Sequence, residues 1–284
     1  MNDLFTRRRR RAARPTEAAS AGTLAATGLR LAYERREVSR DLHLAIPRGK
    51  VTVIIGPNAS GKSTVLRALA RLLRPSEGQI VLDEKDIHEY RPKDFARRLG
   101  LLPQSSVAPG GITVADLVGR GRFPHQQPLR PPTVEDAEAV RRAMAATRVD
   151  TLADRPVEEL SGGQRQRVWV AMLLAQQAPV MLLDEPTTYL DVSHQLDILE
   201  LVRELNRSEG RTIVLVLHDL NQAISYADEL VVVHEGRVVA NGAPVDIMTS
   251  DLLRSVFSID ARIIHDPDIA HPVVVPLTSA RPAI

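Results

Sequence analysis

The sequence predicts an α/β protein whose main sheet is mostly parallel. Continuous apolar runs at residues 180–183, 212–217 and 230–233 have the length of strands and are rich in Val, Ile and Leu. Such runs are typical of strands that are covered on both faces, as in parallel sheets. Residues 198–205 lie between the first two runs and have the apolar spacing of a helix. Strands and helices therefore alternate along the chain, as an α/β core requires.

An earlier part of the chain follows the same pattern. A β-branched run at residues 51–55 leads into a glycine loop, and helical spacing follows at residues 65–73. Two further short strands are predicted at residues 79–82 and 100–102. In an open parallel sheet, ligands bind beyond the carboxyl ends of the strands. Polar motifs that follow these strands are therefore the candidates for a site.

Residues 103–177 interrupt the alternation and are predicted to form a helical insertion. Segments that begin at Thr113 and Thr133 resemble helix capping boxes, because an acidic residue follows each threonine three positions later. Several prolines break the chain between them.

The composition is that of an ordinary globular protein. Of 284 residues, 44% are hydrophobic and 25% are charged, and no apolar run approaches the roughly 18 residues that span a bilayer. We therefore expect a soluble chain. The chain has no cysteine, which excludes disulfides, thiolate zinc sites and cysteine nucleophiles.

The basic character of the chain is concentrated in its first residues. The formal net charge is +2, but residues 1–15 hold six arginines against one aspartate, so the remainder is slightly acidic. The body is therefore not a basic nucleic-acid-binding domain. Residues 1–22 are predicted to be a disordered, Arg-rich tail that is solvated. Contact of this tail with anionic lipid or RNA is the alternative.

One glycine-rich segment fits the phosphate-binding pattern G-x-x-x-x-G-K-[ST] and lies between a predicted strand and a predicted helix. Lysine is scarce here, at four residues against 33 arginines, so its presence in the pattern is specific. Backbone N–H groups and the helix N-terminus bind phosphates in such loops. We therefore predict binding of a nucleoside triphosphate, which the resemblance given below implies is ATP, at Gly56, Pro57, Asn58, Ala59, Ser60, Gly61, Lys62, Ser63 and Thr64.

Two carboxylates follow the apolar run at residues 180–183. Asp184 and Glu185 would emerge at the carboxyl end of that strand, beside the phosphate loop. There Asp184, together with the hydroxyl of Ser63, is suited to bind Mg²⁺. Glu185 is placed to act as the general base that activates the attacking water.

A second anion site is predicted where residues 160–164 open a helix. The segment reads Leu-Ser-Gly-Gly-Gln, and its adjacent glycines leave the backbone amides bare. Because one nucleotide has a single γ-phosphate, already held by Lys62, this second site is predicted to serve a nucleotide on another copy. The residues of this signature are Ser161, Gly162, Gly163 and Gln164.

Together with Gln104, Leu190, Asp191 and His218, these motifs resemble the nucleotide-binding subunit of ATP-binding-cassette (ABC) transporters, over roughly residues 23–257. The resemblance implies a P-loop NTPase cassette with a RecA-like parallel-sheet core, an antiparallel β portion and a helical subdomain. The implied boundaries are a cassette at 23–258, with its core at 23–102 and 178–258 and its helical subdomain at 103–177, followed by a C-terminal extension at 259–284.

The resemblance also implies a role for single residues. Two copies would close head to tail over two ATP molecules as a homodimer, with Asp191 crossing the interface. Tyr33 would stack on adenine, and Gln104 would sense Mg²⁺ or the attacking water. His218 would contact the γ-phosphate and hold Glu185 in register. The implied Mg²⁺ ligands are Ser63, Gln104 and Asp184.

Residues 187–200 and 218–228 are similar to ATPases of importers for iron(III)-siderophores, haem and vitamin B12, and most similar to the iron(III)-siderophore group. This resemblance implies two integral-membrane permease subunits, an extracytoplasmic solute-binding protein, and a place at the cytoplasmic face of the inner membrane. Haem or cobalamin import is the alternative cargo.

A nucleic-acid-associated ABC ATPase is a further alternative. ABC ATPases of the DNA-repair kind need a long coiled coil between the phosphate loop and the signature. Only 95 residues intervene here, and they are broken by prolines and lack sustained heptads. We therefore expect no nucleic-acid partner.

Two smaller features complete the sequence-based expectations. Ala59 stands where many relatives of this kind carry glycine, and a positive φ at this residue would cost about 1 kcal/mol. Near the C-terminus, acidic and histidine side chains between residues 265 and 271 suggest a metal site. The prolines among them favour a loop in a small terminal strand pair instead.

Overall fold

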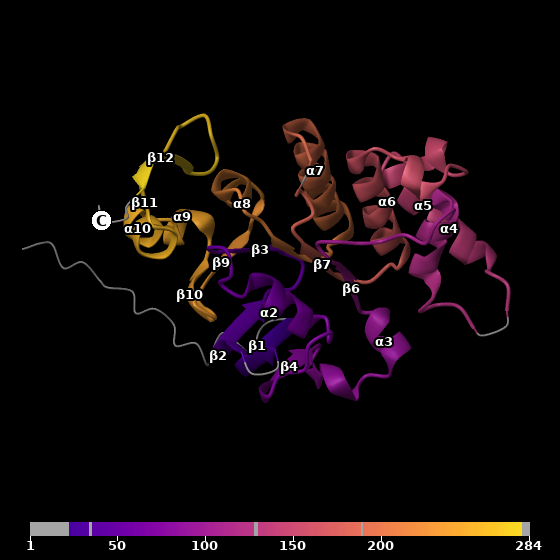
Figure 1. Ribbon diagram of the computed structural model, residues 1–284, viewed down its shortest axis with the longest axis horizontal. Helices are drawn as coiled ribbons and strands as arrows, with labels where there is room; N and C mark the ends of the chain where they lie inside the picture. Colours follow the sequence, from indigo (N-terminus) through magenta and orange to yellow (C-terminus); the bar gives the residue numbers. More distant parts are fainter. Residues whose placement is uncertain (1–22, 34–35, 128–129, 189, 280–284) are drawn as a thin grey trace, which may run out of the picture.

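The structure is a computed structural model that describes residues 23–33, 36–127, 130–188 and 190–279 (Figure 1). The predicted disordered tail at residues 1–22 lies outside these described residues. Within them, no helix has the length and apolar character needed to cross a membrane.

The main sheet has six strands in the order β10-β9-β3-β8-β7-β6. Its neighbours from β9 to β6 are parallel, and β10 is added antiparallel at one edge. The mostly parallel core predicted from the apolar runs is therefore confirmed. The strands are β3 (Val51–Ile55), β6 (Leu99–Leu102), β7 (Val180–Asp184), β8 (Thr212–Val216), β9 (Glu229–His234) and β10 (Arg237–Gly242).

A second, antiparallel sheet packs beside the first, and its order is β2-β1-β4-β5. The strand predicted at residues 79–82 is present, but it belongs to this sheet and not to the parallel one. The strands are β1 (Leu24–Tyr33), β2 (Arg36–Ile46), β4 (Glu77–Leu82) and β5 (Lys85–Asp86).

The parallel strands bury both faces, which explains their continuous apolar runs. Val53 and Leu183 belong to the core cluster shared with the helices, whereas Ile54 and Leu182 belong to the cluster shared with the antiparallel sheet. Alternate residues of a strand point to opposite faces. The parallel sheet therefore has the antiparallel sheet and the helix at residues 62–69 on one face, and the helices at residues 162–175, 192–209 and 220–226 on the other.

Two helices begin at the threonine caps that the sequence predicts. Thr113 and Thr133 accept the backbone N–H of the residue three positions on, and the capping box at Thr133 is complete. The α-helices are α2 (Lys62–Leu69), α3 (Pro92–Ala96), α4 (Val114–Gly119), α5 (Val134–Ala146), α6 (Gly162–Ala175), α7 (Val192–Glu209), α8 (Leu220–Tyr226), α9 (Pro244–Ile247) and α10 (Ser250–Phe257).

Helix α2 is shorter than its apolar spacing indicates. It ends at Leu69, because Ala70 leaves the helical conformation and Arg71 takes a left-handed φ of 62°. The helix was predicted to continue to residue 73. Leu72 is 69% exposed, so this part of the apolar pattern does not belong to a buried helix face.

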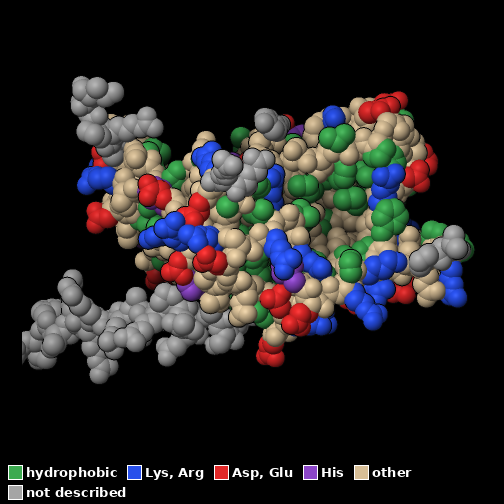
Figure 2. Space-filling model, turned by 60° about the horizontal axis from the view of Figure 1, so that its bottom comes forward, with side chains coloured by type: hydrophobic (Ala, Val, Ile, Leu, Met, Phe, Trp, Pro, Cys, Tyr) green, Lys and Arg blue, Asp and Glu red, His purple; other side chains and the backbone are tan. Residues whose placement is uncertain are grey.

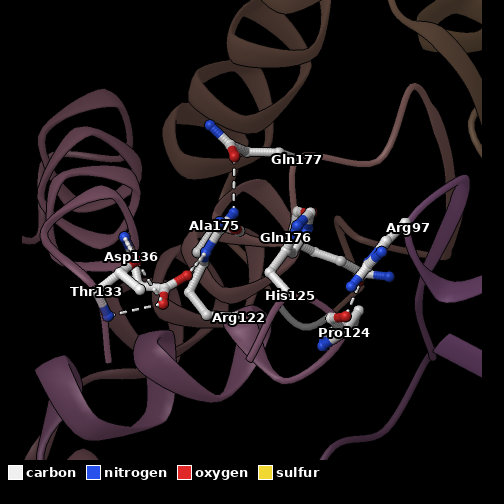
Figure 3. A network of polar contacts seen from close by, with 9 residues as sticks. All are labelled: Arg97, Arg122, Pro124, His125, Thr133, Asp136, Ala175, Gln176 and Gln177. Atoms are coloured by element: carbon white, nitrogen blue, oxygen red, sulfur yellow. Dashed lines mark hydrogen bonds and ion pairs between the residues drawn. The ribbon is translucent and has the colours of Figure 1, made fainter. Parts of the chain in front are cut away.

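Helices α4, α5 and α6 form a separate group at the right of Figure 1. Their anchor is a buried ion pair between Arg122 and Asp136, with Nε and Oδ1 2.8 Å apart (Figure 3). The Arg122 guanidinium also donates to the carbonyl of Ala175 and to the side chain of Gln177. Asp136 in turn completes the capping box of α5 with Thr133. One network therefore joins the chain after α4 to the start of α5 and the end of α6.

The C-terminal residues form the predicted strand pair. Strands β11 (Ile259–Ile264) and β12 (Val273–Ser279) pair antiparallel. Asn221 of α8 fixes this pair to the body, because its side chain exchanges two hydrogen bonds with the backbone of Val274. Among the described residues, no group of acidic and histidine side chains has the arrangement of a metal site.

Candidate functional site

Four neighbouring parallel strands direct polar residues to one edge of the sheet. The phosphate loop follows β3, Asp184 ends β7, His218 comes shortly after β8, and Gln104 comes shortly after β6. Because these strands are adjacent and parallel, their carboxyl ends meet. The structure thus brings together four motifs that are far apart in the sequence.

The phosphate loop is shaped by residues that leave no room for side chains. Gly56 has a φ of 156°, and a Cβ there would lie 2.0 Å from the backbone oxygen of Val233. Gly61, at the start of α2, has a φ of 105°. Ala59 takes a left-handed φ of 62°, the conformation for which a strain of about 1 kcal/mol is expected. The loop thus has the conformation that its glycines permit.

Lys62 lies beneath this loop with its side chain buried. Its Nζ donates to the carbonyl oxygens of Gly56 and Pro57, both at 2.9 Å. An ammonium group has three N–H donors, so one remains for a phosphate oxygen. Burial lowers the pKa of Lys62, whereas the charges of Glu185 and Asp184 oppose that shift.

The loop also holds a buried hydroxyl with an unmet hydrogen-bonding capacity. The Oγ of Ser60 has no hydrogen-bond partner among the described residues. Buried polar atoms are rarely left unpaired in proteins, so such an atom at a phosphate loop fits a ligand that supplies a partner.

Ser63 and Asp184 form a pair suited to a divalent cation. The Oγ of Ser63 donates to Oδ1 of Asp184 at 2.9 Å. Burial raises the pKa of Asp184 against the effect of the Ser63 hydrogen bond, and the charge of Glu185 raises it further. A hydroxyl and a carboxylate are hard oxygen ligands of the kind that Mg²⁺ prefers. These two side chains fit the predicted Mg²⁺ site, because a cation would offset the unfavourable burial of the carboxylate.

Glu185 is held by three side chains that approach its two carboxylate oxygens. His218 Nε2 lies 2.6 Å from Oε1, Gln104 Nε2 donates to Oε2 at 2.5 Å, and Thr188 donates to Oε2 at 3.2 Å. The backbone of Glu185 has a left-handed φ of 52°. Strained backbone of this kind persists where the surrounding contacts fix it, and it is concentrated at functional sites.

A cavity of about 580 Å³ connects these groups. Tyr33 lies at its rim, 40% exposed, and its hydroxyl accepts a hydrogen bond from Arg67 at 3.3 Å. The cavity is lined by Tyr33, Arg36, Glu37, Val38, Asn58, Ala59, Gly61, Lys62, Ser63, Thr64, Glu185, His218, Glu235 and Gly236.

The structure does not bring the signature to this cavity. Among the described residues, neither residues 161–164 nor Asp191 line it. Ser161 instead caps α6, where it accepts the N–H of Gln164 at 3.3 Å, and Gln164 returns a bond to the N–H of Ser161. Asp191 caps α7 in the same way, by accepting the N–H of His194.

Sequence reasoning missed several residues of this region. Thr188 donates a hydrogen bond to Glu185. Its position three residues after this carboxylate could have indicated the contact from the sequence. Arg36, Glu37 and Glu235 line the cavity from β2 and from the turn after β9. These belong to strands and turns whose sequences carry no ligand motif, so only the fold places them there.

Comparison with known proteins shows the family of this chain. A model of the ABC transporter family matches residues 39–188, which is more than half of the chain. The chain belongs to the ABC transporter family. Its members bind ATP, and this chain is an ATPase of that family.

Relatives and solved structures extend the match to nearly the whole chain. The ferric enterobactin transport ATP-binding protein FepC of Escherichia coli K12 is 51% identical, covering 90% of this chain and 94% of FepC. The achromobactin transport ATP-binding protein CbrD of Dickeya dadantii is 48% identical, covering 89% and 94%. A metal-chelate type ABC transporter, solved in an inward-facing conformation, superposes with a TM-score of 0.78 at 27% identity, covering 90% and 98%.

Proposed function

We propose that this chain is the ATP-hydrolysing subunit of an importer for iron(III)-siderophores. The observation that carries the hydrolytic role is the carboxylate of Glu185, fixed by Gln104, Thr188 and His218 at the edge of the phosphate-loop cavity. A carboxylate in that place accepts a proton from water as the water attacks the γ-phosphate.

The remaining residues of the cavity bind and orient the nucleotide. The backbone amides of residues 56–64 and the Lys62 ammonium contact the phosphates, and Tyr33 at the rim stacks on the adenine. Ser63, Asp184 and Gln104 would hold Mg²⁺, which neutralises phosphate charge when it is bound. His218 contacts the γ-phosphate and keeps Glu185 in place.

The separation of the signature from this cavity supports a working unit of two copies. Residues 161–164 are exposed or half-buried at the start of α6, where the backbone N–H groups of Gly162 and Gly163 have no acceptor within the helix. A second copy, placed head to tail, brings its own signature to the γ-phosphate bound by Lys62. Asp191 then lies at the interface between the copies.

Two integral-membrane permease subunits complete the transporter in this proposal, and an extracytoplasmic solute-binding protein delivers the cargo to them. The ATPase lies at the cytoplasmic face of the inner membrane, where short permease helices dock near Gln104. Figure 2 shows hydrophobic side chains gathered around a hollow on the helical side of the molecule. Among the residues that line a cavity of about 520 Å³ between α4 and α5 is Phe123, which is 60% exposed. An exposed apolar surface of this kind favours a protein partner.

The variant Glu185→Gln tests the hydrolytic proposal. It keeps the size of the side chain, but the amide cannot accept the proton, and its NH₂ group donates where a carboxylate oxygen accepted. We expect ATP to bind normally, closed dimers to accumulate, and turnover to fall by about 10²–10⁴-fold. Scattering and steady-state ATPase measurements check this. The control is Glu138→Gln, which alters a surface carboxylate paired with Arg141. Parent-like turnover in Glu185→Gln would remove the assignment of the general base.

The cargo is tested on the assembled transporter. The chain is co-purified with its permease subunits in lipid, and ATPase activity is measured with the binding protein loaded with ferric siderophores, haem or cobalamin. We expect stimulation by a ferric siderophore, because the relatives FepC and CbrD are named for transport of such compounds. Stimulation by haem or cobalamin alone would assign the chain to the alternative cargo.

A further inference from the structure

The two adjacent glycines of the signature have different surroundings. A Cβ added to Gly162 would meet no described atom within 4 Å. A Cβ added to Gly163 would lie 2.8 Å from Cδ2, 3.1 Å from Cγ and 3.2 Å from Nε2 of His194. The imidazole ring of His194 therefore occupies the space that a side chain at position 163 would need.

The ring of His194 is fixed from its other side by Asp191. Its Nδ1 lies 2.7 Å from Oδ1 of Asp191, and the same oxygen accepts the backbone N–H of His194 at 2.9 Å. This backbone bond, together with the hydrogen bonds from Ser193 and from the imidazole, holds the pKa of Asp191 at about 2. The carboxylate is thus ionised at neutral pH and keeps the imidazole against Gly163.

A second contact joins the same two helices one turn further on. Arg167 of α6 forms an ion pair with Asp197 of α7. These residues follow Gly163 and His194 by four and three positions, so the two contacts lie about one helical turn apart on each helix. The approach of Gly163 to His194 is therefore accompanied by a second side-chain contact between α6 and α7.

The first turn of α7 is also held to the helix that follows His218. Gln195 donates to the backbone oxygen of Leu190 at 2.9 Å, and Gln222 of α8 donates to the side chain of Gln195 at 2.7 Å. His194 and Gln195 are consecutive, yet they contact different helices. The turn that contains Asp191 is thereby fixed from two sides.

We propose that His194 is a positioning residue that holds the signature turn and the Asp191 turn of one chain together as a single unit. The second signature glycine is required within its own chain, because Gly163 must leave room for the imidazole. This proposal rests on the proposed function, in which both turns face a second copy. Its consequence is that dimer closure, and not the first binding of ATP, depends on His194.

The expected size of the effect follows from the population of the competent arrangement. Without the imidazole, the starts of α6 and α7 are free to shift, so fewer molecules present both turns correctly. Apparent affinity falls by the fraction that remains competent. We expect about a tenfold loss, which corresponds to about one molecule in ten keeping both turns in the competent arrangement.

The first test introduces His194→Ala into the Glu185→Gln background. The ATP concentration for half-maximal dimer formation is measured by light scattering, and ATP binding to dilute monomer is measured by fluorescence. We expect the former to rise about tenfold and the latter to change less than about twofold, with partial recovery in His194→Asn, whose amide donates to Asp191. Unchanged dimerisation in His194→Ala would overturn the proposal. Failure of the Glu185→Gln parent to dimerise would instead refute the proposed function.

The control for this test is His43→Ala. His43 and Asp41 form a similar exposed pair, with Nε2 and Oδ1 2.9 Å apart, on β2. We expect its dimerisation to match that of the parent. An equal loss in both variants would show a general effect of removing a surface His–Asp pair and would overturn the specific role of His194.

The second test asks whether the imidazole of His194 occupies the space that a Cβ at position 163 would need. Gly163→Ala alone should impair dimer formation by about tenfold or more, because the new Cβ meets the imidazole. In the double variant with His194→Ala the Cβ has room, so the losses should not add, and dimerisation should be no weaker than in His194→Ala alone. Thermal melting verifies that each variant folds. Fully additive losses would show that Gly163 is needed for another reason, such as phosphate approach.

Discussion

The phosphate-loop region and the signature region are both predicted to bind anions at the start of a helix, but they are built in opposite ways. Six residues between Asn58 and Thr64 line a cavity, and the side chains of Lys62 in it and of Asp184 beside Ser63 are buried. The signature begins α6 at the surface, and among the described residues Gly162 faces open space. In the proposed function, the first region binds the nucleotide of its own chain, and the second region binds the nucleotide that another copy holds.

The difference shows where each region obtains its rigidity. The phosphate loop is attached to β3 in the middle of a six-stranded sheet, between β9 and β8. The signature depends on a group of helices that is held by the Arg122 network and by the packing of His194. Changes in the sheet region should therefore alter ATP binding, whereas changes in the helical region should alter stability and pairing of copies.

The largest expected effect concerns the phosphate-loop region. Lys62→Ala removes a buried charge that contacts the loop and that, in the proposed function, binds a phosphate oxygen, so ATP affinity should fall by about 10²-fold or more. Isothermal titration calorimetry measures this. The control is Lys93→Ala, which removes an exposed lysine bound to the backbone oxygen of Gln126. Parent-like affinity in Lys62→Ala would mean that the cavity does not hold the phosphates through this loop.

A large effect of another kind is expected in the helical region. Arg122→Leu leaves the buried carboxylate of Asp136 without its partner, so the free energy of unfolding should fall by about 3–5 kcal/mol. Chemical denaturation followed by circular dichroism checks this. At a temperature where the variant is folded, its ATP affinity should stay within about twofold of the parent. A comparable loss of ATP affinity would contradict the independence of the two regions.

A pH dependence follows from the same ion pair. Burial raises the pKa of Asp136, but the hydrogen bonds from Thr133 and Arg122 outweigh it and hold the pKa below its ordinary value of 3.8. The stabilisation is therefore present above that value and is lost as the pH falls through the lower pKa of the folded state. Thermal melting from pH 6 to pH 3 should show a fall that is smaller in Asp136→Asn. Parallel curves for the two proteins would exclude this group as the cause.

The smallest effect is expected at Ala59. Glycine tolerates the left-handed φ of 62° that alanine adopts with strain, so Ala59→Gly should raise the free energy of unfolding by at most about 1 kcal/mol. Because the loop has this conformation before ATP binds, the affinity should change little. Denaturation melts detect the difference. A destabilised Ala59→Gly protein would show that the flexibility of glycine outweighs the relief of strain.

The parallel core could be predicted from the sequence because its strands are buried on both faces and read as unbroken apolar runs. The antiparallel sheet was implied by the family resemblance, but the residue pattern did not predict its strands β1 and β2. The pairing of β1 with β2 has irregular register between Ala26 and Leu29 and again near Leu31, so the alternation that indicates a half-buried strand is interrupted. The end of α2 also depended on a left-handed Arg71, for which the sequence has no signal.

The candidate site could be predicted where its chemistry is local. The phosphate loop, Asp184 and Glu185 are contiguous motifs at strand ends, and the strand order explains why they meet. The contact of His194 with Gly163 joins residues that are 31 positions apart on two different helices, and no spacing rule relates them. Such contacts follow from helix packing and are visible only in three dimensions.

The left-handed backbone at Glu185 limits which side chains position 185 accepts, apart from any question of chemistry. Asparagine, aspartate and glycine adopt this conformation with the least strain, whereas valine, isoleucine and threonine are the least compatible with it. A saturation library at this position, sorted only for correctly folded protein, should therefore be depleted of β-branched residues. The backbone conformation thus limits which amino acids position 185 tolerates, in addition to the limit that catalysis sets.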